Sequence, residues 1–132
     1  MDPKVEAFLN EHHDAVMTTT KRDGRPHVAR ISVGLVEGRL WSSGTQDRIR
    51  TKHLRRDPRC TLMVLDETNR YRWLALETTV DILDGPDAVD RNLALYRVLA
   101  GEPDDLQEYR DAMVRERRLI YQFNLDRSYG QF

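Results

Sequence analysis

Six of the twelve residues from Arg48 to Arg59 are lysine or arginine, in a chain whose formal net charge is only −1. Two small hydroxyl residues, Ser42 and Ser43, come shortly before this basic segment. Cations and hydroxyls near the start of a helix are the groups that hold a phosphate, because exposed backbone N–H groups and the helix dipole attract anions. The segment therefore predicts an anion site.

A basic run can also be a solvated helix face, and that alternative stays open. Two features favour the anion site. Arg48 and Arg50 fall in the expected first helical turn, where the dipole disfavours positive charge, so a bound anion would explain them. The upstream hydroxyls can also donate to phosphate oxygens. The later cations are ordinary charges for the end of a helix: Arg55, Arg56 and Arg59.

The composition narrows the class of protein. A chain of 132 residues predicts one domain, spanning 1–132. A pI of about 6.4 argues against nucleic-acid binding, which needs a basic face. No apolar run is long enough for a membrane span. The single cysteine, Cys60, excludes an internal disulfide, and the absence of an apolar leader at the start predicts a cytoplasmic protein.

Catalytic side chains do not stand out. The four histidines lack the spacing of a metal site, and no acid, base or nucleophile constellation is present, so the catalytic residues stay unknown. If the protein is an enzyme, a bound cofactor is expected to supply the chemistry. Tyr71 and Trp73 lie two residues apart on an expected strand and share one face. They fit either a core or a wall for a flat ring.

The elements that would position these residues begin with a helix and three strands. The strands are joined by two short turns, which predicts an antiparallel meander, because parallel neighbours need a long crossover. The expected helix runs from Pro3 to about His12, and the expected strands are Ala15–Lys21, His27–Val36 and Arg39–Ser43.

The rest of the chain adds strands and a helical hairpin. Asp57-Pro58 ends the basic helix. Cys60–Leu65 is a continuous apolar run, typical of a strand buried on both faces. A further strand, two helices and a last strand are expected at Tyr71–Leu83, from Val89, from Leu106 and at Leu119–Leu125. About six antiparallel strands with short turns predict a mainly β fold, a small curved barrel with helices over its open ends.

With these elements in place, the sequence resembles the pyridoxamine-phosphate-oxidase-like split β-barrel family, and most closely its deazaflavin-dependent oxidoreductase branch. The similarity is carried by Thr18–Val28, Arg48–Arg59, Ala94–Glu102 and Tyr109–Val114, and the string Leu54–Arg59 is its most specific part. It covers nearly the whole chain. Three positions depart from the common pattern: Arg50 replaces a lysine, His53 an asparagine and Thr78 a glycine.

The resemblance implies a homodimer with a cofactor in the cleft between subunits. Arg48 and Arg50 would hold the cofactor phosphate, helped by Ser42 and Ser43 on the preceding strand. Lys52 would contact the anionic tail. Aromatic side chains matching Tyr71 and Trp73 would lie near the ring, in the partner's half of the cleft.

The implied activity is hydride transfer from reduced deazaflavin coenzyme, coenzyme F420, to a small unsaturated organic substrate. Two alternatives stay open: an oxidoreductase of the same fold that uses flavin mononucleotide (FMN), and a non-catalytic protein that binds either cofactor. The C-terminal motif of true pyridoxamine-phosphate oxidases is missing from Asp126–Phe132, which argues against vitamin B6 oxidation.

Overall fold

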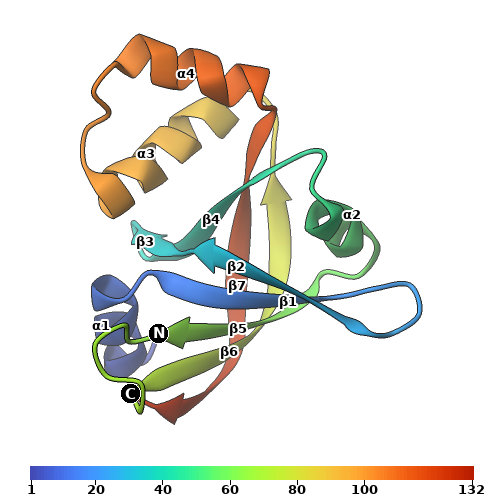
Figure 1. The fold of residues 1–132 in the computed structure, drawn as a ribbon, viewed down its shortest axis with the longest axis vertical. Coiled ribbons are helices and arrows are strands. Elements are labelled where there is room, and N and C mark those ends of the chain that lie inside the picture. Colours follow the sequence, from blue (N-terminus) through green and yellow to red (C-terminus); the bar gives the residue numbers. More distant parts are fainter.

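Seven strands and four helices make up the protein in a computed structural model that describes every residue from Met1 to Phe132 (Figure 1). The helices are α1 (Pro3–Glu11), α2 (Ile49–Arg56), α3 (Ala88–Ala100) and α4 (Leu106–Arg115). The strands are β1 (Asp14–Thr20), β2 (Pro26–Ser32), β3 (Gly34–Val36), β4 (Arg39–Thr45), β5 (Arg59–Leu65), β6 (Trp73–Leu83) and β7 (Arg118–Gln131). None of the helices is both long and apolar enough to cross a bilayer.

All seven strands belong to one antiparallel sheet, in the order β2-β1-β5-β6-β7-β4-β3. The sheet curls strongly, with α1 and α2 at its two ends and the α3–α4 pair beyond β4 and β7 (Figure 1). The predicted class, a mainly β split barrel with peripheral helices, is confirmed, with seven strands in place of about six.

The expected strand His27–Val36 is two strands, so the prediction of one meander is wrong. β2 pairs with β1 at one edge of the sheet, whereas β3 pairs with β4 at the other. The chain changes partner at Val33, whose N–H donates to the carbonyl of His13 at 2.8 Å. Ser42 Oγ donates to the carbonyl of Ser32 at 2.7 Å, which ties β4 to the end of β2. Both predicted turns are present. Local sequence does not reveal that the chain passes from one edge of the sheet to the other at Val33.

The prediction that Cys60–Leu65 is buried on both faces is also wrong for the single chain. Along β5, Cys60, Leu62 and Val64 face the core, while Thr61 and Met63 are exposed. No helix covers this outer face of the sheet. The outer face of β5, which includes the exposed Met63, is therefore not covered by any other element of the chain.

The core lies inside the curl and is closed by α1. Val5, Phe8 and Leu9 occupy one face of α1 and are fully or almost fully buried, as their i, i+3, i+4 spacing predicts. Asp2 caps the helix by accepting from the N–H of Lys4 at 2.7 Å. These residues pack against the inward-facing side chains of every long strand, so α1 closes one end of the barrel.

A buried carboxylate joins α1 to the β5–β6 turn. Asp66 accepts from the N–H groups of Thr68 and Asn69 at 2.9 and 3.0 Å and from Arg72 at 3.0 Å. Burial would raise the pKa of Asp66, but these hydrogen bonds and the nearby His12 outweigh it and lower the pKa to about 2. The turn that carries Tyr71 is thus fixed by an ionised aspartate.

The α3–α4 hairpin packs on the edge of the sheet formed by β3, β4 and β7. Gly34 is needed there, since a Cβ on it would lie 3.2–3.3 Å from Leu95, Val98 and Leu99 of α3. The rings of Tyr96 and Tyr109 meet 4.8 Å apart and join the two helices. Both helices lie where the spacing of apolar residues predicts them.

Candidate anion and cofactor site

The first turn of α2 is a helix start without a protein cap. Arg48 is the N-cap residue, with an extended backbone and no side-chain hydrogen bond to the turn, and no acidic residue follows in the first turn. The first N–H groups of a helix lack intrahelical acceptors, so they are available to an anion. The helix ends at Asp57, before Pro58, as expected.

The cations of the basic segment divide into two groups. The first three, Arg48, Arg50 and Lys52, form no ion pair with an acidic side chain, and the Arg50 side chain approaches only the Tyr121 hydroxyl. The later ones are engaged: Arg55 pairs with Asp84 at 3.1 Å, Arg56 donates to the carbonyl of Thr20, and Arg59 pairs with Asp57 at 2.8 Å. The division matches the one expected from the sequence. Free positive charge is therefore concentrated at the start of the helix.

A buried tyrosine supports this turn from below. Thr51 Oγ1 donates to the carbonyl of Thr45 at 2.7 Å, so the Tyr121 hydroxyl, its other partner, is the donor to Thr51. Gly44 makes room for the ring, because a Cβ there would lie 2.4 Å from the phenolic oxygen. β4 includes Gly44 and Thr45, two residues beyond the predicted end at Ser43. The floor of the site is thus built by β4 and β7.

Arg50 has a buried side-chain nitrogen without a hydrogen-bond partner near Tyr121. Its Nε atom is buried and has no hydrogen-bond partner, although buried polar atoms are normally paired. Burial raises the pKa of Tyr121, while its hydrogen bond with Thr51, the positive charges of Arg50 and Arg48, and the approach of the Arg50 side chain to the hydroxyl act to lower it. Both guanidinium groups therefore lie near the phenol. An unpaired buried donor beside free cations fits a site for a phosphate-bearing cofactor.

The two serines predicted to align the phosphate are already engaged elsewhere. Ser42 is buried on the inner face of β4 and donates to the carbonyl of Ser32. Ser43 lies on the opposite face, where its Oγ donates to Oδ1 of Asn92 in α3 at 2.5 Å. The structure gives neither hydroxyl a contact with α2, so these serines hold β4 in place beneath the site.

The β5–β6 turn and the start of β6, which carry Tyr71 and Trp73, lie at the other end of the sheet from α2 (Figure 1). β5 starts directly after α2 and ends at Leu65, which is paired with Trp73. Seven residues of strand span about 20 Å, so the aromatic pair cannot reach the anion site of its own chain. Trp73, the first residue of β6, packs edge-on against Tyr129 at 6.2 Å. Tyr71 lies in the turn before β6, not on the strand as predicted, and is 74% exposed.

Two histidines join α2 to the β1–β2 hairpin. His53 Nδ1 is 2.9 Å from Thr19 Oγ1, and the rings of His53 and His27 meet edge-on at 5.1 Å. Burial lowers the pKa of His53, and the charges of His27, Arg56 and Lys21 lower it further. The arrangement positions α2 on the sheet, and Arg30, whose role the sequence left open, pairs with Asp14 on the outer face.

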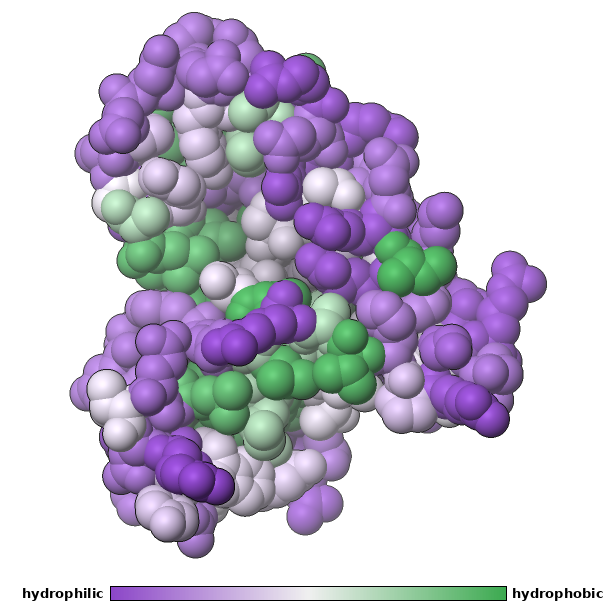
Figure 2. Space-filling view, viewed as in Figure 1, coloured by the Kyte–Doolittle hydropathy of each residue, from purple (hydrophilic) through white to green (hydrophobic).

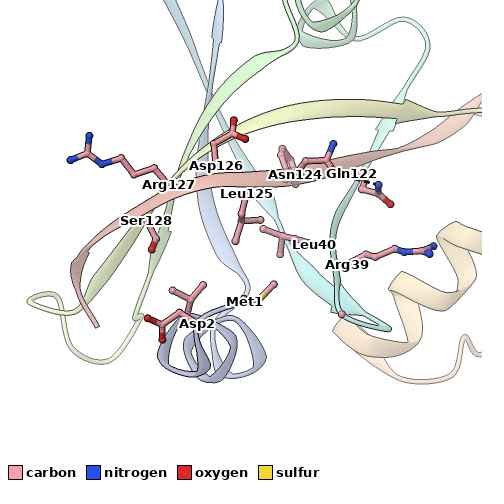
Figure 3. A pocket seen from close by; sticks show the side chains of 13 residues that line it. Met1, Asp2, Arg39, Leu40, Gln122, Asn124, Leu125, Asp126, Arg127 and Ser128 are labelled. Atoms are coloured by element: carbon pink, nitrogen blue, oxygen red, sulfur yellow. Dashed lines mark hydrogen bonds between the residues drawn. The ribbon is translucent and has the colours of Figure 1, made fainter.

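Two cavities flank the sheet. One is a shallow, open hollow of about 410 Å³ at the start of α2, lined by Thr45, Asp47, Arg48, Glu116 and Arg118. A larger one, of about 510 Å³, lies between α1 and β7, with Leu40 and Leu125 pointing into it and Arg39 and Arg127 extending to opposite sides (Figure 3). Each cavity is lined by two arginines and two acidic residues, so the charge of the lining does not separate them. The candidate anion site is assigned to the start of α2 because Arg48, Arg50 and Lys52 there have no acidic partner.

Residues that the sequence did not single out complete the site. Tyr121, Thr51 and Arg117 were not predicted, and only Gly44 gave a signal, because a glycine near a strand end can mark close approach of another group. Arg117 comes from the turn between α4 and β7 and pairs with Asp47 at 3.1 Å. The fold brings this turn to the loop before α2.

Comparison with known proteins places this geometry in context. A family model described as pyridoxamine 5'-phosphate oxidase matches residues 1–129. A biliverdin reductase of Mycobacterium tuberculosis (strain CDC 1551 / Oshkosh), named as dependent on reduced coenzyme F420, is 26% identical over 129 residues. That alignment covers 94% of this chain and 83% of the relative.

Solved structures share the fold. A conserved hypothetical protein from Mycobacterium tuberculosis superposes with a TM-score of 0.82 at 20% identity, covering 97% of this chain and 82% of the other. A protein described as an F420 reductase superposes with a TM-score of 0.76 at 21% identity, covering 96% of each chain. At these identities the superpositions establish the architecture.

Proposed function

Since this chain belongs to the pyridoxamine 5'-phosphate oxidase family, and its free cations gather at one uncapped helix start, we propose that it is a reductase that binds reduced coenzyme F420. The bound coenzyme would supply a hydride to a small unsaturated organic substrate, and solvent would supply the proton. The reductase relative named as dependent on this coenzyme supports the choice.

The observation that carries the proposal is the division of charges on α2. Arg48, Arg50 and Lys52 have no acidic partner, whereas Arg55 and Arg59 pair with aspartates and Arg56 donates to the carbonyl of Thr20. Unpaired guanidinium groups at a helix start are suited to a phosphate, with charge-assisted hydrogen bonds of about 1.5–3 kcal/mol each. Arg48 and Arg50 would hold the phosphate. Lys52, one helical turn after Arg48, would meet the anionic tail.

The outer face of the sheet supports the second part of the proposal, a homodimer. Val16, Met63, Ala75 and Tyr129 are paired in turn across β1, β5, β6 and β7 and form an apolar row. Val28 on β2 is 62% exposed. Figure 2 shows apolar side chains gathered over β2, β1 and β5. A second copy covering this face would bury the exposed side of β5.

The dimer also gives Tyr71 and Trp73 a role. They lie too far from α2 of their own chain. A partner packed on the outer face would bring its own Tyr71 and Trp73 to the cleft between the subunits, beside α2 of the first chain. There they would form a wall for the ring, while Arg48 and Arg50 of the first chain hold the phosphate. Neither chain would contain a complete site alone.

FMN is the alternative cofactor, because its phosphate would suit the same helix start. Calorimetric titration with both cofactors distinguishes them, and purified protein with a flavin spectrum would favour FMN. Turnover is then measured anaerobically, as loss of the reduced deazaflavin absorbance with a panel of enones, quinones and biliverdin. Tight binding of coenzyme F420 with turnover of at least one acceptor supports the proposal. Binding without any turnover would indicate a carrier, and failure to bind would refute it.

A further inference from the structure

Asp47 is an acid placed directly before the proposed anion site. It lies in the loop between β4 and α2 and is followed at once by Arg48. A free carboxylate at this position would repel a phosphate, and it would also compete for Arg48 and Arg50 as an internal ion-pair partner. The chain needs a means of keeping Asp47 away from these cations.

Arg117 supplies it through both its backbone and its side chain. Its guanidinium donates to Oδ1 of Asp47 at 3.1 Å, and its carbonyl accepts from the N–H of Gln46 at 3.1 Å. The N–H of Arg117 donates to the carbonyl of Val114 at 3.1 Å. The turn after α4 is thus attached to the loop before α2 at two adjacent residues.

The backbone of Arg117 adopts a conformation that is unfavourable for a residue with a side chain. Its φ is +54°, in the left-handed region that favours glycine or asparagine. The turn itself would be satisfied by glycine, which would keep the carbonyl contact to Gln46. A strained arginine at such a point indicates a use for the side chain. The only acidic partner of that side chain is Asp47.

We propose that Arg117 is a positioning residue of the anion site, which holds the loop before α2 and pairs with Asp47 so that Arg48 and Arg50 stay free for a phosphate. This inference rests on the proposed function. It assigns to the α3–α4 hairpin, through its last turn, a direct effect on cofactor affinity.

Three variants and a control test it. Arg117→Gly removes the side chain but suits the positive φ, Asp47→Asn removes the competitor, and the double variant combines them. Arg115→Ala is the matched control, because Arg115 ends the same helix and pairs with Glu108 at 3.1 Å, away from the loop. Each protein is titrated by calorimetry with coenzyme F420 and with inorganic pyrophosphate, at low and high salt, and its melting temperature is measured.

We expect Arg117→Gly to weaken binding about two- to fivefold at low salt, the range of an exposed ion pair. Its melting temperature should not fall, and the loss should shrink at high salt. Asp47→Asn and the double variant should bind equally well, because no competitor remains. A purely structural role would instead lower affinity and melting temperature together in both backgrounds.

Three results would overturn the inference: unchanged affinity in Arg117→Gly, an equal loss in the Asp47→Asn background, or no binding of either probe by the parent. If the parent binds pyrophosphate but not coenzyme F420, the proposed cofactor is wrong. The pyrophosphate series then still decides the role of Arg117.

Discussion

Replacing Arg50 by alanine is the sharpest single perturbation of the proposed site. Its Nε is buried without a hydrogen-bond partner, and its guanidinium pairs with no acidic residue, so its removal breaks no ion pair within the chain. The lost contact is a charge-assisted hydrogen bond to phosphate, which contributes about 1.5–3 kcal/mol. Its loss should raise the dissociation constant roughly ten- to 150-fold. Arg50→Lys keeps the charge and should lose less.

The assay is calorimetric titration of parent and variants with coenzyme F420, with circular dichroism melting to show that each variant is folded. Arg59→Ala is the control, since Arg59 is 79% exposed and already pairs with Asp57. It should bind within about twofold of the parent, in keeping with the small value of exposed ion pairs. An Arg50→Ala protein that melts like the parent and binds equally tightly would refute the anchor.

Three further predictions concern the interface, the floor and acid stability. Met63→Glu should place a charge in the apolar row and convert the proposed dimer into a folded monomer, as measured by sedimentation velocity; a dimer in the variant would exclude this face. Gly44→Ala should lower the free energy of unfolding by about 1–3 kcal/mol through overpacking against Tyr121, and an unchanged denaturation midpoint would contradict the close approach. The pKa of Asp66 is lowered to about 2 in the folded protein, so between about pH 4 and 2 this carboxylate binds more protons in the unfolded chain than in the folded one. Its stabilising effect is present above that range and is lost as the pH falls through it. Asp66→Asn should therefore be less stable than the parent at neutral pH, with a difference that shrinks in acid; a difference independent of pH would oppose this.

Local sequence patterns predicted most of the elements. The apolar spacing in α1, α3 and α4, the Asp57-Pro58 stop after α2 and the hairpin at Asp23–Pro26 all act over a few residues, so the sequence reveals them. The division of the basic segment was also readable, because Asp57 lies beside the later cations.

Long-range pairing was not readable. The separation of β2 from β3 depends on how β7 reaches across to β4, and no local signal at Val33 marks the change. The exposed face of β5 depends on which surfaces the helices leave uncovered. Tyr121 and Arg117 meet the α2 loop only because β7 returns beside β4, about 70 positions along the chain, with the pairing of Thr45 and Arg118 fixing the register.

The central claim is that one chain holds the cofactor phosphate while its partner shapes the ring pocket, and a crystal structure of the complex with coenzyme F420 tests it most directly. We predict a dimer packed through β1, β2 and β5, with the phosphate bound to Arg48 and Arg50 of one chain and the ring beside the partner's Trp73. A phosphate bound instead in the cavity between α1 and β7, with Arg48 and Arg50 turned to solvent, would contradict the account.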